Sequence, residues 1–95
     1  MRVYISGPIT HDKNYKKKFE YAEALLKIYG IEEVFNPAKV NLPDNTTWEE
    51  YMKHDLNELL KCDGIYMLKG WRRSKGARLE YKIAKALGLK IAYKS

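Results

Sequence analysis

Gly64-Ile65-Tyr66-Met67-Leu68 is the stretch that decides the fold, because it is a short and almost unbroken apolar run. A strand with one face in water alternates apolar and polar residues, whereas a strand of a parallel sheet is covered on both faces and is apolar throughout. The run therefore predicts a parallel strand over residues 64–68 that is covered on both sides. Strands parallel to it must be reached through crossover segments, which are usually helices.

Strands and helices alternate around this run. The β-branched and aromatic residues 2–6 predict a first strand that Gly7-Pro8 ends, and Thr47 with Glu50 predicts a capping box at a helix start. The other elements that we expect are a helix over about 13–29, a strand over 33–35, helices over about 47–61 and 75–87, and a strand over 89–93. This order predicts right-handed crossovers and one α/β domain over residues 1–95, with a parallel four-stranded sheet of Rossmann-like or flavodoxin-like type and helices on both faces.

Composition narrows the class of protein. The 95 residues carry 18 basic and 12 acidic side chains, and the net charge of +6 favours anionic partners without choosing among them. Lysines on the predicted helices, Lys16, Lys17 and Lys18 among them, are typical of a solvated face. Cys62 is the only cysteine, and with two separated histidines it makes neither a disulfide nor a metal-binding pattern.

We accordingly expect no metal and no cofactor. No apolar run approaches the roughly 20 residues of a membrane span, and the apolar start of the chain is too short for a signal peptide. The sequence therefore predicts a cytoplasmic protein without a membrane partner.

Two carboxylates occupy apolar helix faces. Asp55 falls in the row formed by Trp48, Tyr51, Met52, Leu56, Leu59 and Leu60, and Glu80 falls in the row formed by Ala77, Ile83, Ala84 and Leu87. Both rows face the sheet, and ligands of such sheets bind at the carboxyl ends of the strands, where the loops 6–10, 36–47 and 69–74 gather. We expect both acids to point into one pocket. Each could be a paired structural group, but two carboxylates together suit the cleavage of a glycosidic bond.

A candidate phosphate site opens the last predicted helix. Ser74-Lys75-Gly76 follows Arg72 and Arg73, and a helix start offers free N–H groups and the positive end of the helix dipole. The alternative is an ordinary serine cap. Ser6-Gly7-Pro8 is either a ligand loop or a turn that needs glycine, and Trp71 is either a base-stacking lid or a loop anchor.

The chain resembles the nucleoside 2-deoxyribosyltransferase-like superfamily, and especially its small members described as a domain of unknown function, DUF4406. The resemblance covers nearly the whole chain. It rests on residues 4–8, Asn36-Pro37, Tyr51-Met52 with Asp55, residues 62–68, Gly70-Trp71 and residues 74–80.

The resemblance implies roles for single residues. Glu80 would attack the anomeric carbon of deoxyribose and form a covalent glycosyl-enzyme, and Asp55 would help to protonate the departing base. Ser74 stands where transferases of free nucleosides tend to carry an acid and where hydrolases of deoxynucleoside 5′-monophosphates carry serine. The residues expected to bind the substrate are Tyr4, Ser6, Gly7, Pro8, Asn36, Trp71, Arg72, Ser74 and Gly76.

The resemblance thus implies an N-glycosidase or deoxyribosyltransferase that acts on 2′-deoxynucleotides or nucleosides, with hydrolysis of the monophosphate favoured, and that forms dimers or larger homo-oligomers. The alternative is a nucleotide-binding or sensing module in which Glu80 is idle. A nucleic-acid-binding protein fits least well, because it would need arginines and lysines clustered with aromatic residues, and only Arg72-Arg73 beside Trp71 approaches that pattern.

Overall fold

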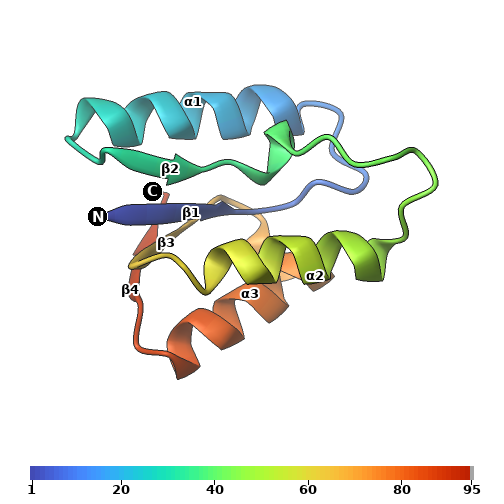
Figure 1. Cartoon of the computed structure of the whole chain (residues 1–95). Helices are drawn as coiled ribbons and strands as arrows, with labels where there is room; N and C mark the ends of the chain where they lie inside the picture. The colour runs from blue at the N-terminus through green and yellow to red at the C-terminus, as the bar shows by residue number, and fades with distance from the viewer. Residues whose placement is uncertain (95) are drawn as a thin grey trace.

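The computed structural model describes residues 1–94 and confirms the predicted alternation of strands and helices (Figure 1). The strands are β1 (Arg2–Ser6), β2 (Glu33–Phe35), β3 (Gly64–Met67) and β4 (Lys90–Tyr93), and the helices are α1 (Tyr15–Ile28), α2 (Trp48–Leu59) and α3 (Lys75–Ala86). Two 3-10 helices, η1 (Pro37–Lys39) and η2 (Trp71–Arg73), lie in segments that the sequence predicts as loops. The capping box of Thr47 and Glu50 is present at the start of α2.

The sheet is parallel throughout, with the strand order β2-β1-β3-β4. From β1 the chain moves to β2 on one side, and then crosses to β3 and β4 on the other. Since parallel crossovers are right-handed, this reversal places α1 on one face of the sheet and α2 and α3 on the opposite face (Figure 1). The order is flavodoxin-like, and its switch point between β1 and β3 is where such sheets bind ligands.

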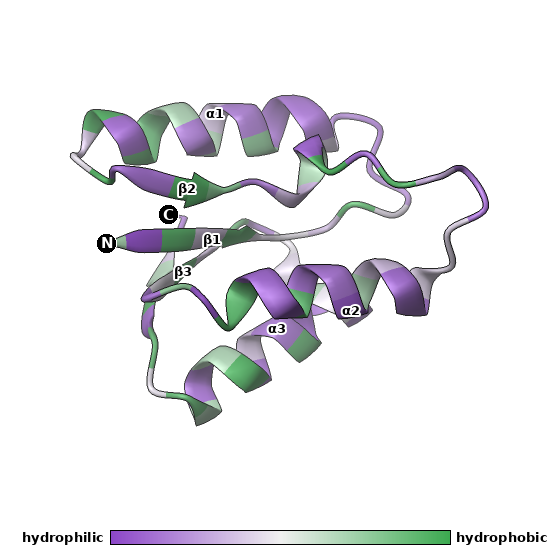
Figure 2. Ribbon diagram, in the orientation of Figure 1, coloured by the Kyte–Doolittle hydropathy of each residue, from purple (hydrophilic) through white to green (hydrophobic). Residues whose placement is uncertain are grey.

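Each face of the sheet buries its own core. Tyr4 and Ile5 are both 0% exposed and point to opposite faces, because side chains alternate along a strand. Tyr4 packs in the cluster that includes Leu59 of α2, and Ile5 packs with Phe19 of α1. Figure 2 shows apolar and polar residues alternating along each helix, as expected of helices with one face on a sheet. Within residues 1–94, no helix is both long and apolar enough to cross a membrane.

The apolar rows predicted for the helices end earlier than expected. Leu60 and Leu87 are 59% and 54% exposed, although each belongs to an apolar row of the sequence. Tyr29 is 76% exposed, although it continues the apolar spacing of Phe19, Ala22 and Leu26. Each is the C-cap residue of its helix, where the chain turns toward the next strand. The last apolar residue of each predicted row therefore lies outside the face of the helix that packs on the sheet.

Glu23 of α1 is a buried carboxylate that the periodicity did not indicate. It accepts a hydrogen bond from Asn36 Nδ2 at 3.1 Å, and its oxygens lie 3.1 Å from Lys27 Nζ and 3.0 Å from Lys39 Nζ. Burial raises the pKa of Glu23, but the hydrogen bonds from Asn36, Lys39 and Lys27 outweigh burial and hold the pKa at about 2. Asn36 also accepts from Ala38 N at 2.9 Å, so this network joins α1 to η1.

We predict that Glu23→Gln destabilises the fold at pH 7 by about 1–2 kcal/mol, because the charged hydrogen bonds to Asn36 and the lysines are weakened. A pKa held below its ordinary value stabilises the fold above pH 4.5, and the gain is lost as the pH falls toward about 2. The difference between wild type and variant should therefore shrink in acid. Urea unfolding at pH 7 and pH 3.5, followed by circular dichroism, measures it.

The exposed Glu20 on the same helix provides the control. Glu20→Gln removes the same charge without touching η1, so its stability should stay close to that of wild type. An equal loss in both variants would show that the charge of α1, and not the Glu23 network, is responsible.

Candidate functional site

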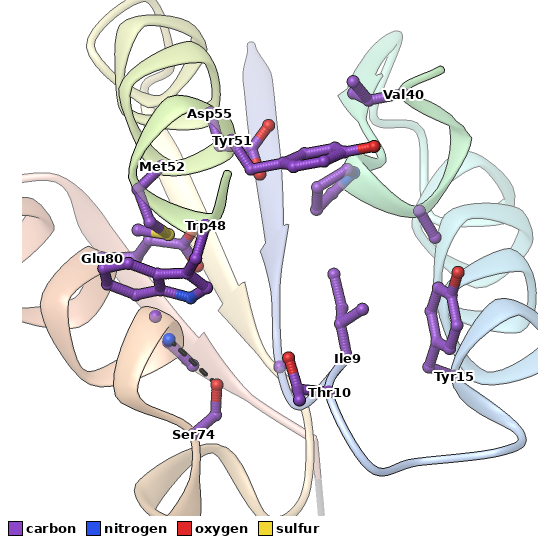
Figure 3. A pocket seen from close by; sticks show the side chains of 15 residues that line it. Ile9, Thr10, Tyr15, Val40, Trp48, Tyr51, Met52, Asp55, Ser74 and Glu80 are labelled. Carbon is purple, nitrogen blue, oxygen red and sulfur yellow. Dashed lines mark hydrogen bonds between the residues drawn. The ribbon is translucent and has the colours of Figure 1, made fainter. Parts of the chain in front are cut away.

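A cavity of about 310 Å³ opens at the carboxyl edge of the sheet (Figure 3). Its walls come from the loop after β1, from η1 and from the amino-terminal parts of α2 and α3, with Tyr15 of α1 at one side. The predicted loops thus gather at the switch point between β1 and β3. The lining residues are Gly7, Ile9, Thr10, Tyr15, Pro37, Ala38, Val40, Trp48, Tyr51, Met52, Asp55, Ser74, Gly76, Ala77 and Glu80.

Asp55 and Glu80 both line this cavity, as the sequence predicts. Asp55 is 7% exposed and Glu80 is 6% exposed, so both carboxylates are withdrawn from water. They reach the cavity from α2 and α3, which lie on the same face of the sheet. Burying two acids beside each other costs free energy unless they are hydrogen-bonded or neutral.

Two hydroxyl groups of β1 hold Glu80. Tyr4 OH donates to Oε2 at 2.6 Å, and Ser6 Oγ donates to Oε1 at 2.6 Å. Tyr4 and Ser6 are two residues apart on the strand, so their side chains share the face that α3 covers. Both are 0% exposed and neither lines the cavity. The prediction that Tyr4 and Ser6 line the substrate pocket is therefore wrong. Both side chains instead hold the Glu80 carboxylate in position.

The two carboxylates have raised pKa values for related reasons. Burial raises the pKa of Glu80 to about 7, opposed by the hydrogen bonds from Ser6 and Tyr4 and assisted by the negative charge of Asp55. Burial also raises the pKa of Asp55, while His54, whose Nδ1 lies 3.1 Å from Oδ1, opposes the rise. Burial and the charge of Glu80 raise the pKa of Tyr4 well above its ordinary value, so Tyr4 stays a donor. Glu80 thus changes charge near neutral pH.

Ser74 and Gly76 line the same cavity at the start of α3. Ser74 Oγ accepts from Ala77 N at 3.2 Å and so caps the helix, as Figure 3 shows. The first N–H groups of a helix have no acceptor within it, and Ser74 satisfies only that of Ala77. A Cβ on Gly76 would lie 3.1 Å from Met52 Sδ, so glycine also permits the close approach of α2 and α3. The start of α3 therefore lines the same cavity as the carboxylates of Asp55 and Glu80.

Other residues predicted for the site lie elsewhere. Trp71 is 9% exposed and its ring centroid lies 4.5 Å from that of Tyr81, so it is a loop anchor in the core and not a base-stacking lid. The guanidinium of Arg72 lies 4.7 Å from the Trp71 ring centroid and is absent from the cavity wall. Pro8 lines a different cavity, and Asn36 binds Glu23. The prediction that these four residues line the candidate site is therefore wrong, because η1, η2 and the loop after β1 turn their side chains away from the first cavity.

Aromatic and apolar lining residues were missed as site residues. Trp48, Tyr51 and Met52 line the cavity, although their place in the helix row that contains Asp55 predicts core residues. They lie one and two turns before Asp55, toward the helix start, which in a parallel α/β sheet faces the ligand edge. That position was the signal that could have identified them. Trp48 is 37% exposed, and Lys75 Nζ lies 4.3 Å from its ring centroid.

We predict that Glu80→Gln becomes more stable than wild type as the pH rises. A folded-state pKa of about 7, against an ordinary 4.5, favours the protonated acid, so wild-type stability falls between these pH values and is level above them. The amide that replaces the carboxyl group in the variant does not titrate. The stability advantage of the variant over wild type should therefore grow by about 3 kcal/mol between pH 4 and pH 8. Urea unfolding across this range measures the change.

Glu49→Gln, at an exposed position of α2, is the matched control and should follow the wild-type profile. Parallel profiles for wild type and Glu80→Gln would contradict the raised pKa.

Within residues 1–94, no group of three or more His, Cys, Asp or Glu side chains is arranged to hold a metal ion.

Comparison with known proteins places the chain in a family. A search of curated proteins finds no match to the chain. A family profile matches residues 1–93, almost the whole chain. The protein therefore belongs to the family described as Domain of unknown function (DUF4406).

Proposed function

We propose that this protein cleaves the N-glycosidic bond of 2′-deoxynucleotides, with 5′-monophosphates as the favoured substrates. The observation that carries the proposal is the pair of buried carboxylates in one cavity, of which Glu80 is held by Tyr4 OH and Ser6 Oγ, each at 2.6 Å. The resemblance of the sequence to the nucleoside 2-deoxyribosyltransferase-like superfamily supports the choice of substrate class.

Glu80 is the proposed nucleophile. Each carboxylate oxygen accepts one hydrogen bond from a hydroxyl group, which leaves a second lone pair on that oxygen for attack. As a Glu80 oxygen bonds to C1′ of the sugar, the C1′–N bond breaks and its electron pair passes to the base. The hydroxyl donors orient the carboxylate before the substrate arrives. Because the pKa of Glu80 is about 7, the attacking anion forms near neutral pH.

Asp55 is the proposed acid. It lines the same cavity as Glu80, and burial raises its pKa, which favours the protonated form that a general acid needs. Water then attacks C1′, returns a proton to Asp55 and releases Glu80 as a carboxylate. A second base in place of water would make the reaction a transfer. The two carboxylates thus act in different protonation states, as buried pairs of acids do.

The start of α3 supports a monophosphate substrate. Ser74 and Gly76 border the cavity at this helix start, and the Lys75 ammonium lies 4.3 Å from the ring centroid of Trp48, which also lines the cavity. Anions bind favourably at such helix starts. A phosphate held there contributes binding energy away from the reacting bond, and that energy can be used in the transition state.

We predict that wild-type protein releases free base from deoxynucleoside monophosphates and that Glu80→Gln does not. Removal of a nucleophile leaves only the catalysis due to binding, so the rate should fall by about three orders of magnitude or more. Chromatography of the bases after incubation with each monophosphate measures release. A mass increase on Glu80 after an acid quench would identify the sugar adduct.

Glu49→Gln is the control and should release base at the wild-type rate. Full activity in Glu80→Gln would reject the nucleophile. Binding of monophosphates by the wild type without release of base would instead identify a nucleotide-sensing module on the same cavity.

We also predict that monophosphates have a higher kcat/KM than the matching deoxynucleosides, by about tenfold or more. Ser74→Asp should remove this preference, because its carboxylate would repel the phosphate, while turnover of nucleosides should change little. Steady-state kinetics on matched pairs of substrates measure the ratio.

Ser74→Asn is the matched control, because Asn has the shape of Asp and caps helices comparably but carries no charge. The preference should survive in Ser74→Asn. Wild-type kinetics in which nucleosides equal or exceed monophosphates would reject the phosphate site and favour base exchange on free nucleosides.

A further inference from the structure

A second cavity, of about 420 Å³, lies on the α1 side of the sheet, on the face opposite α2 and α3. Phe19 and Leu68, which are 0% and 4% exposed, belong to the core of that face and border the cavity with Pro8. Tyr21, which is 61% exposed, adds an aromatic wall. The cavity therefore has an apolar floor and an aromatic wall that reaches solvent.

Lysines surround this floor. They come from separate parts of the chain: Lys17 and Lys18 from α1, Lys69 from the segment after β3, and Lys94 from the segment after β4. No aspartate or glutamate lines the cavity. The tertiary structure thus brings Lys69 and Lys94 to the same cavity as Lys17 and Lys18, two helix lysines that the sequence predicts to lie on a solvated face.

The ammonium groups are largely uncompensated. Lys18 Nζ is paired with Asp12 at 2.9 Å, but within residues 1–94 neither Lys17 nor Lys69 forms an ion pair, and Lys94 Nζ lies 5.4 Å from the Tyr21 ring centroid. Lysines that line one cavity repel each other through their like charges. A bound anion relieves this repulsion and gains charge-assisted hydrogen bonds.

The size and lining of the cavity indicate what kind of anion fits. Small-ligand cavities usually measure about 300–1,000 Å³, and they combine an apolar lining with a few polar groups. An extended nucleic acid needs a groove that follows its backbone, whereas this opening is compact. Inorganic phosphate would leave the apolar floor unused. The lining suits a ligand that has both a flat apolar ring and several negative charges.

We propose that this cavity is a second binding site, for a nucleoside triphosphate, with the base against Leu68 and Tyr21 and the phosphates among Lys17, Lys69 and Lys94. The site is independent of the proposed glycosidase reaction. One loop separates it from the first cavity: Gly7 lines the first and Pro8 lines the second. A Cβ on Gly7 would lie 2.8 Å from Leu68 Cβ, so this partition is tightly packed.

The test is a titration of ¹⁵N-labelled protein with dATP, followed by NMR at physiological salt. Signals of Tyr21, Lys69 and Lys94 report the second cavity, and signals of Tyr51 and Gly76 report the first. Gly7 and Pro8 are adjacent, so the signals of their loop are not used to assign the site. We expect saturable shifts at the second cavity. Base release is not measured, so failure of the glycosidase proposal leaves this result unaffected.

Two further ligands separate the contributions of charge and ring. Tripolyphosphate lacks the base and deoxyadenosine lacks the phosphates, and each should bind about tenfold or more weakly than dATP. Equal binding of tripolyphosphate and dATP would overturn recognition of the nucleoside.

Charge-reversal variants test the lysines. The double variant Lys17→Glu with Lys69→Glu should weaken dATP binding at the second cavity by about tenfold or more. The matched control, Lys53→Glu with Lys82→Glu, changes the net charge equally at exposed positions outside the cavity and should bind as wild type does. Equal weakening in both double variants, or shifts confined to Tyr51 and Gly76, would overturn the proposal.

Discussion

The hydrogen bonds that Tyr4 and Ser6 donate to Glu80 join β1, an inner strand of the sheet, to α3, and the candidate site is organised around them. Without these donors the carboxylate would be buried with few polar partners, at a cost of several kcal/mol. Even with them, its pKa is raised to about 7. The ionised Glu80 side chain therefore lowers the stability of the folded protein at neutral pH. Such a cost is typical of a position kept for chemistry, because stability alone would favour an apolar residue there.

The strand order explains why this carboxylate faces a cavity. The chain reverses direction across the sheet at β1, so the segments after β1 and β3 part and leave a crevice that the starts of α2 and α3 border. The opposite wall depends on a separate network, in which Glu23 holds Asn36 and Asn36 caps η1. Each wall is thus fixed by buried polar contacts of its own. A site held in this way is shaped before a ligand enters.

The net charge of +6 is distributed in a way that composition does not reveal. Lys75 lies over the ring of Trp48, which lines the first cavity, and lysines from α1 and from the segments after β3 and β4 border the second. The loop of Gly7 and Pro8 stands between the two cavities. Of these two cavities in a member of the DUF4406 family, the first, at the carboxyl edge of the sheet, is lined by two carboxylates, and the second, on the α1 side, is lined by lysines.

The sequence by itself determined the features that depend on local periodicity. The apolar run at 64–68 predicted a strand covered on both faces, the capping box at Thr47 predicted the start of α2, and the acids at 55 and 80 were predicted inward from their places in apolar rows. Only the tertiary structure decided which groups meet. Tyr4 and Ser6 lie 76 and 74 residues from Glu80 along the chain, and Trp71, Glu23 and the converging lysines likewise depend on distant partners. Periodicity determines which face of an element a residue occupies, whereas strand order and register determine what that face contacts.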